Sequence, residues 1–179
     1  MINTDVIFAG FGGQGILMVG NLLAIAAMEE GRQVTYFPAY GVEMRGGTAN
    51  CTVVISDDEI GSPVIGHPKA CVVMNAPSLE KYQPLMAAGG TLIVNRSLVG
   101  ESGVTRTDLS VLFVDANDVA RKVGSLQLAS MVALGAYAAK TGVVRLDTLC
   151  ECLPKVVSKK YEKFIPLNIN ALMEGASFA

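Results

Sequence analysis

The chain has 179 residues, of which 51% are hydrophobic and 17% are charged. This is enough apolar material for the core of one ordinary domain, here residues 1–179, and it excludes disorder as the main state. The net charge of -2 provides no overall attraction to nucleic acid or to an anionic membrane. No run reaches the roughly 18 uninterrupted apolar residues of a spanning helix, and no signal peptide is recognisable. We therefore expect a cytoplasmic protein.

Short apolar runs alternate with segments of helical periodicity along the whole chain. In chain order the pattern predicts strand 5–9, helix 14–30, strands 34–37, 48–56 and 71–74, helix 78–88, strands 91–95 and 111–114, and helices 116–123, 125–140, 146–157 and 166–175. Pro38 is expected to end the second strand because proline has no amide hydrogen for the ladder. The polar character of residues 100–108 predicts a loop or hairpin. Met28, Met74 and Met131 are expected in the core. This alternation favours an α/β, Rossmann-like fold, with a mostly parallel twisted sheet and helices on both faces.

The cysteines do not have the spacing of a metal or iron–sulfur site. Cys51, Cys71, Cys150 and Cys152 include no C-x-x-C pair, and His67 is the single histidine. On a helix, Cys150 and Cys152 would point to different faces and could not bind one ion together. We therefore expect no metal centre built by this chain alone, and we interpret the thiols as reduced core residues.

A glycine-rich segment follows the first predicted strand. Residues 10–15 read G-F-G-G-Q-G, which fits G-x-G-x-x-G between a strand and a helix. Glycines let the backbone approach a ligand closely, and the helix N-terminus presents free amides with a partial positive charge. The loop is therefore suited to a nucleotide or pyrophosphate. The alternative, that the glycines only allow the strand and helix to pack closely, stays open.

Hydride transfer on a dinucleotide is not favoured. NAD-binding folds place an acidic residue at the end of the second strand, for the ribose hydroxyls. Here that strand ends with Tyr36-Phe37-Pro38, and the single histidine belongs to no recognisable acid–base group. No catalytic residue is assigned to this chain.

A second glycine-flanked loop follows the second predicted strand. In a parallel α/β sheet it would lie at the carboxyl edge, where ligands bind. Arg45 could bind a phosphate or carboxylate through two hydrogen bonds, or form an exposed ion pair with Glu43 that contributes little stability. The polar or flexible candidates in this loop are Tyr40, Glu43, Met44, Arg45, Gly46 and Gly47.

The two loops together resemble a known family. G-F-G-G-Q-G-I followed by P-A-Y-G-V-E-M-R-G-G-T-A-N-C-T-V-V-I-S closely resembles the gamma subunit of 2-oxoacid:ferredoxin oxidoreductases. The resemblance extends in order over nearly the whole chain, through residues 60–63, 75–79, 134–136 and 168–175. Its details are most similar to the 2-oxoglutarate enzyme, with the pyruvate and 2-ketoisovalerate enzymes close to it.

The resemblance implies a reaction that this chain does not perform alone. The family's complexes convert a 2-oxoacid and coenzyme A to acyl-CoA, CO2 and reduced ferredoxin. Thiamine diphosphate and the iron–sulfur clusters are expected on partner subunits of the alpha, beta and delta types. The gamma domain is expected to help bind coenzyme A and assemble the complex.

The same resemblance suggests residue roles. Coenzyme A phosphates are expected at Gly10, Gly12, Gly13, Gln14, Gly15 and Ile16. Arg45 is expected either to add a charged contact or to anchor its loop against a partner subunit. Tyr40, Glu43, Met44, Gly46 and Gly47 are expected at a subunit interface. Asn75 and Asn168 are secondary candidates, for which a turn, a cap or a local backbone hydrogen bond is an equal explanation.

Two other functions stay open at this stage. The chain could be a stand-alone nucleotide-binding oxidoreductase, or a nucleotide-binding domain without enzymatic activity. An isolated chain could also form a homodimer. A basic stretch containing Lys155, Lys159, Lys160 and Lys163 is interpreted as a solvated helix face.

Overall fold

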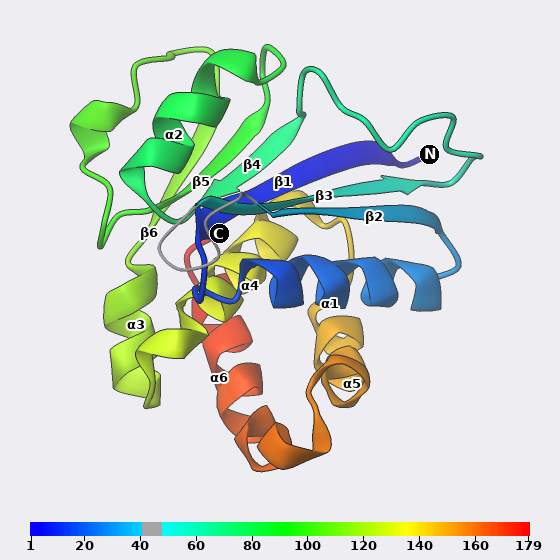
Figure 1. Ribbon diagram of the computed structural model, residues 1–179, viewed down its shortest axis with the longest axis vertical. Helices are drawn as coiled ribbons and strands as arrows, with labels where there is room; N and C mark the ends of the chain where they lie inside the picture. Colours follow the sequence, from blue (N-terminus) through cyan, green and yellow to red (C-terminus); the bar gives the residue numbers. More distant parts are fainter. Residues whose placement is uncertain (41–47) are drawn as a thin grey trace.

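The computed structural model describes residues 1–40 and 48–179, with only the backbone at Tyr40 (Figure 1). Within these residues the chain forms a six-stranded sheet of order β2-β3-β1-β4-β5-β6. The strands are β1 (Asn3–Phe11), β2 (Gln33–Tyr40), β3 (Thr48–Ser56), β4 (Ala70–Val73), β5 (Thr91–Asn95) and β6 (Ser110–Val114). Strands β1, β4, β5 and β6 are parallel, and β3 is antiparallel to both β1 and β2. The predicted mostly parallel α/β sheet is confirmed.

Helices cover both faces of the sheet unequally (Figure 1). On one face lie α1 (Ile16–Glu29), α3 (Ala116–Val123), α4 (Ala129–Thr141), α5 (Leu146–Val156) and α6 (Ile165–Ala176); on the other lies α2 (Ala76–Tyr82). Short 3-10 helices are η1 (Gln83–Leu85), η2 (Glu101–Gly103), η3 (Leu126–Leu128) and η4 (Lys159–Phe164). No helix within the described ranges has the length and apolar character needed to cross a membrane.

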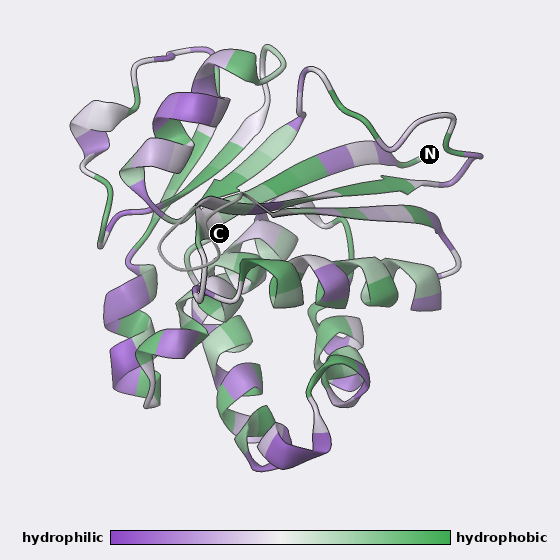
Figure 2. Cartoon of the chain, viewed as in Figure 1, coloured by the Kyte–Doolittle hydropathy of each residue, from purple (hydrophilic) through white to green (hydrophobic). Residues whose placement is uncertain are grey.

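Alternating strand residues build two separate apolar cores. Val6 and Phe8 of β1 face the core shared with α1 and α4, whereas Ile7 and Ala9 face the core shared with α2. Helix α4 is apolar on almost every side, because it packs between the sheet, α6 and its other neighbours. Figure 2 shows this as hydrophobic colouring of the strands and α4, while α3 is mostly hydrophilic outside.

Several element boundaries differ from those predicted. Pro38 does not end β2; it pairs with Cys51 inside the strand, and β2 is an edge strand, where a missing amide hydrogen is tolerated. The helix predicted at 78–88 begins at Ala76 and gives way to η1, which contains Pro84. The helix predicted from residue 125 opens as the separate turn η3.

The methionine predictions were partly right. Met74 and Met131 are buried, at 1% and 0% exposure. Met28 is 61% exposed, because it lies in the last turn of α1 and faces solvent. Hydrophobic periodicity predicts which side of a helix is buried. It does not predict how far along the helix the neighbouring elements continue to cover that side.

Helices α4 and α6 cross at unusually short distance through two glycines. A methyl group on Gly135 of α4 would overlap the carbonyl oxygen of Leu172 in α6. A methyl group on Gly175 of α6 would overlap the carbonyl oxygen of Val132 in α4. Each helix therefore has a glycine where the backbone of the other helix approaches it. The two helices could not pack this closely if either position carried a side chain.

We expect Gly135→Ala to lower the free energy of unfolding by about 3 kcal/mol, at the upper end of overpacking costs, because backbone must move to admit the methyl group. Urea denaturation measures this change. Gly66→Ala is the matched control, because the space around a methyl group there is open, and it should change stability by less than about 0.5 kcal/mol. Equal effects of the two substitutions would contradict the close crossing.

Candidate functional site

The segment between β1 and α1 turns sharply through two glycines with left-handed backbone. Gly13 has φ of +90° and Gly15 has φ of +76°, a region that other residues occupy at a cost of about 1–2 kcal/mol. The Gln14 amide donates to the Phe11 carbonyl at 3.2 Å, and the Gln14 side-chain oxygen accepts from the Phe11 amide at 2.6 Å. Gln14 therefore braces the turn from both its backbone and its side chain.

The N-terminus of α1 carries no side-chain cap. Gly15 occupies the cap position, no side chain accepts a hydrogen bond there, and the first turn contains no acidic residue. The first amides of a helix have no partner within the helix, and together with the helix dipole they favour an anion. The end of α1 therefore retains the donors and the positive potential that a phosphate needs.

A buried hydroxyl lies directly behind this helix end. Ser130 on α4 is 2% exposed, and its oxygen has no hydrogen-bond partner in the described part of the chain. A methyl group on Gly15 would come within 2.6 Å of that oxygen. The Ser130 hydroxyl thus lies against Gly15 with its hydrogen-bonding capacity unused, next to the donors of the helix.

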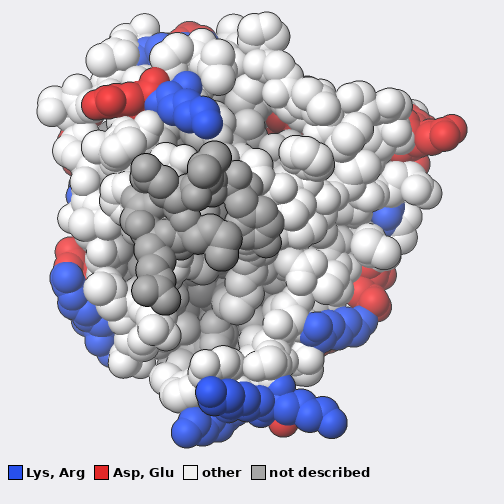
Figure 3. Space-filling model, in the orientation of Figure 1, with Lys and Arg blue, Asp and Glu red and all other residues white. Residues whose placement is uncertain are grey.

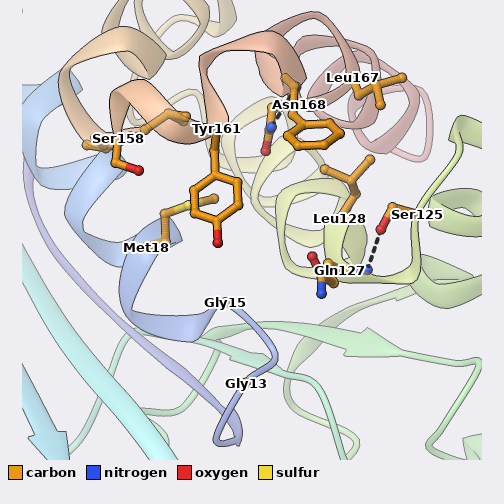
Figure 4. Close-up of a pocket in the computed structure, with 13 residues that line it drawn as sticks. Gly13, Gly15, Met18, Ser125, Gln127, Leu128, Ser158, Tyr161, Leu167 and Asn168 are labelled. Atoms are coloured by element: carbon orange, nitrogen blue, oxygen red, sulfur yellow. Dashed lines mark hydrogen bonds between the residues drawn. The ribbon is translucent and has the colours of Figure 1, made fainter.

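The loop opens onto a cavity of about 610 Å³. Gly13, Gly15 and Met18 form one side, η3 contributes a second side, and residues 156–168 close the third (Figure 4). The lining residues are Gly13, Gly15, Met18, Ser125, Gln127, Leu128, Val156, Val157, Ser158, Tyr161, Phe164, Leu167 and Asn168. Figure 4 shows the Tyr161 hydroxyl directed across the cavity toward the glycine loop. This volume lies within the usual range of small-molecule sites, about 300–1,000 Å³.

The lining of this cavity is neutral. Among the described residues no aspartate, glutamate, lysine, arginine or histidine lines it, and its polar side chains are hydroxyls and amides. An anion in the cavity would therefore be stabilised by the amides and dipole of α1 rather than by an ion pair. The apolar remainder suits an organic group attached to that anion.

The predicted glycine-loop residues divide into two groups. Gly13 and Gly15 line the cavity, and Gly12 is exposed in the same turn. Gly10 lies within β1, where a methyl group would be only 3.0 Å from Cβ of Met74. Ile16 is buried beneath the loop in the core, so it holds the helix end in place from below.

The second predicted loop lies mostly outside the described residues. Glu43, Met44, Arg45, Gly46 and Gly47 all fall between 41 and 47, and the Tyr40 side chain is also outside the description. The flanking backbone is described. Strand β2 ends opposite Ala49, and β1 ends opposite the neighbouring Thr48. Both loops therefore begin at the same edge of the sheet.

The two predicted asparagines have different positions. Asn75 caps α2, since its side-chain oxygen accepts from the Ser78 amide at 2.9 Å. Asn168 lines the cavity, and its side-chain nitrogen donates to the Phe164 carbonyl at 2.8 Å. The cap and the local backbone bond anticipated for these residues are both present.

The far wall of the cavity was not predicted from the sequence. Ser125, Gln127, Tyr161, Phe164 and Leu167 carry no motif, and folding alone brings them to the loop. The one sequence signal was a pair of aromatic residues spaced by three within a basic stretch. Their rings lie 6.3 Å apart by centroid.

Comparison with known proteins decides the family. Residues 5–178 match the pyruvate ferredoxin/flavodoxin oxidoreductase family (POR). The chain belongs to this family. The resemblance inferred from the two loops is therefore confirmed.

Relatives in the POR family occur in two lengths. The chain is 39% identical over 173 residues to the ketoisovalerate oxidoreductase subunit VorA of Methanothermobacter thermautotrophicus, covering 96% of this chain and 35% of VorA. It is 36% identical over 177 residues to the 2-oxoglutarate synthase subunit KorC of Methanothermobacter marburgensis, covering 96% of this chain and 94% of KorC. The chain thus spans about a third of one relative and nearly all of the other.

A solved structure agrees with the fold. The gamma subunit of keto/oxoacid ferredoxin oxidoreductase from Geobacter sulfurreducens PCA has a TM-score of 0.86 and 28% identity to this chain. The match covers 99% of this chain and 97% of that one. The similarity therefore extends over the whole described fold of this POR-family chain and is not limited to the glycine loop.

The cysteines of this POR-family chain do not converge. Cys51 belongs to the core on the α1 side of the sheet and Cys71 to the core on the α2 side, while Cys150 and Cys152 lie on α5. No three His, Cys, Asp or Glu side chains in the described ranges form a group that could hold a metal. Burial raises the pKa of the Cys51 and Cys71 thiols to about 12. Both thiols are therefore protonated at neutral pH, and their burial limits the access of reagents.

We expect one thiol to react with Ellman's reagent in the folded protein at pH 8. Cys150 is the partly exposed cysteine, whereas Cys51, Cys71 and Cys152 are buried, so these three should react only in denaturant. Cys150→Ser should abolish the reaction of the folded chain and leave three thiols reactive in guanidinium. Rapid native reaction of Cys51 or Cys71 would contradict their burial.

Proposed function

We propose that this chain is the gamma subunit of a 2-oxoacid:ferredoxin oxidoreductase, with residues 1–179 forming one domain that works in the cytoplasm. The complete enzyme would convert a 2-oxoacid and coenzyme A to acyl-CoA, CO2 and reduced ferredoxin. Membership of the POR family and near full-length similarity to KorC support this proposal. We favour 2-oxoglutarate as substrate on the motif details, with pyruvate and 2-ketoisovalerate as the alternatives.

Coenzyme A is the proposed ligand of the glycine-loop cavity. The observation that carries the proposal is the uncapped N-terminus of α1, whose donors and positive potential meet a neutral, mostly apolar cavity. Coenzyme A combines a diphosphate with long neutral groups, which is the chemistry that such a lining accepts. Gly13 would contribute close backbone approach to the diphosphate, and Ser130 behind Gly15 could turn its unused hydroxyl toward the same region.

The thiamine and electron-transfer chemistry is assigned to partner chains of the alpha, beta and delta types. An iron–sulfur cluster needs several converging thiolates, and the described cysteines lie on two faces of the sheet and on α5. The residues present therefore do not fit a cluster, and we derive no redox step within this chain. The gamma chain would bind the acyl acceptor, and its partners would carry out decarboxylation and deliver electrons to ferredoxin.

Gly13→Ala is expected to weaken coenzyme A binding by about tenfold, equivalent to about 1.4 kcal/mol. Its methyl group would project into the open space that the diphosphate would occupy, and alanine would be strained at the positive φ of this position. Calorimetric titration of the assembled enzyme measures the affinity. Thiamine-dependent decarboxylation should persist at least in part, while acyl-CoA formation falls at subsaturating coenzyme A.

Gly31→Ala is the matched control for this substitution. Gly31 has φ of +80° with open space around it, and it follows the opposite end of α1, roughly 20 Å from the loop. Both substitutions should reduce stability to a similar extent, about 1 kcal/mol. Only Gly13→Ala should reduce coenzyme A affinity. Equal loss of both half-reactions in Gly13→Ala would instead indicate defective assembly.

Association with partner chains tests the subunit assignment. A tagged copy expressed in its native host should co-purify with a thiamine diphosphate-binding chain and an iron–sulfur chain. The isolated chain should show no turnover of 2-oxoglutarate, pyruvate or 2-ketoisovalerate. Turnover with NAD(P) by the chain alone would support a stand-alone oxidoreductase, and binding of nucleotide without any partner chain would support a domain lacking enzymatic activity.

A further inference from the structure

The cavity wall formed by η4 carries a cluster of exposed lysines. Lys159, Lys160 and Lys163 are all exposed on this short helix, and we call them the η4 lysines. Tyr161 and Phe164, which alternate with them, line the cavity. Figure 3 shows lysine and arginine side chains gathered at the lower end of the molecule, where Figure 1 places η4. The basic stretch read from the sequence as a solvated face therefore borders the candidate site.

Two of these ammonium groups lie against the rings of the cavity wall. Lys160 Nζ is 5.5 Å from the centroid of the Tyr161 ring, and Lys163 Nζ is 5.1 Å from the centroid of the Phe164 ring. Contacts at this range hold the lysine chains along the rings. The positive charges are thereby kept beside the wall that the same rings form.

Their charge is not neutralised nearby within the described structure. Lys155, the other lysine of this stretch, is paired with Glu29 of α1. None of the η4 lysines forms an ion pair with a described residue, and Glu162 is the single acidic residue on η4. Positive charge therefore flanks the neutral lining from two sources: the end of α1 at one side, and the exposed ammonium groups beside the η4 wall at the other.

The direction in which coenzyme A binds follows from the location of the chemistry. Under the proposed function, its thiol must reach an acyl group formed on a partner chain, so the pantetheine arm has to leave this cavity. The nucleotide end is then the part retained between the glycine loop and η4. That end carries, besides the diphosphate, a separate phosphate on the 3′ position of the ribose.

We propose that the η4 lysines bind the 3′-phosphate of coenzyme A, while the glycine loop binds its diphosphate and Tyr161 packs against its nucleoside. This inference rests on the proposed binding of coenzyme A in the cavity. Ammonium groups form strong charge-assisted hydrogen bonds with phosphate. The cavity would thus distinguish coenzyme A from nucleotides that lack this phosphate, including dephospho-coenzyme A.

The test compares coenzyme A with dephospho-coenzyme A by calorimetric titration of the assembled enzyme. The wild-type protein should bind coenzyme A at least about tenfold more tightly, as expected for one added charge-assisted contact. In the double variant Lys160→Ala/Lys163→Ala, coenzyme A should bind about as weakly as dephospho-coenzyme A does. The affinity for dephospho-coenzyme A itself should differ from that of the wild-type protein by less than about twofold. Raising the salt concentration should reduce the wild-type preference, because exposed charges are screened.

The control variant is Lys81→Ala/Lys140→Ala. It removes the same net charge, and Lys81 also lies over a ring, that of Tyr82 on α2 across the sheet. It should retain the full preference for coenzyme A. Equal wild-type affinities for the two ligands would overturn the inference, and so would equal weakening of both ligands by the η4 substitutions. Neither result would contradict the proposal that the cavity binds coenzyme A. Failure of both ligands to bind would overturn the proposed function as well.

Discussion

The close crossing of α4 and α6 is the constraint on which the candidate site depends. Helix α4 contacts α6 through Gly135 and Gly175, and its Ser130 lies against Gly15 of the loop. Its Tyr137 packs edge-on against Phe8 of β1, with ring centroids 5.9 Å apart. One helix thus contacts both the glycine loop and α6, which contributes Leu167 and Asn168 to the opposite side of the cavity. A cavity fixed by backbone contact is formed before any ligand arrives, which lowers the entropy lost on binding.

Under the proposed binding of coenzyme A, the two sources of positive charge around the cavity would have different roles: the end of α1 in affinity, and the η4 lysines in discrimination between ligands. The α1 amides point at a neutral, partly enclosed space, where electrostatic interactions are stronger than in water. The η4 lysines are exposed, and solvent and salt screen their field. Anion binding at α1 therefore needs no buried ionised side chain, and so avoids the desolvation that a buried ion pair would impose. The exposed charges are better suited to distinguishing ligands that share the same diphosphate.

The sequence predicted local structure better than it predicted the site. Alternating strand and helix patterns identified the sheet, and the position of residues 10–15 between β1 and α1 identified the glycine loop. Pro38 was misread because its effect depends on whether the strand lies at the edge, which is a property of the whole sheet. Tyr161 and Leu167 could not be placed across the cavity from Gly13, since the packing of α6 on α4 and on its other neighbours brings that segment back toward the loop.

The glycine pattern itself meets two different physical demands. Gly10 and Gly15 have neighbours that a side chain would strike, Met74 at one and Ser130 at the other. Close packing is thus sufficient to explain both of them. Gly13 has no atom within 4 Å of a would-be Cβ, yet its φ of +90° still favours glycine. From the sequence, ligand binding and close packing were alternative explanations for the whole motif. In the structure the two explanations are compatible, because they apply to different glycines. Gly10 and Gly15 are tightly packed and hold the turn, and this turn leaves Gly13 open to the cavity.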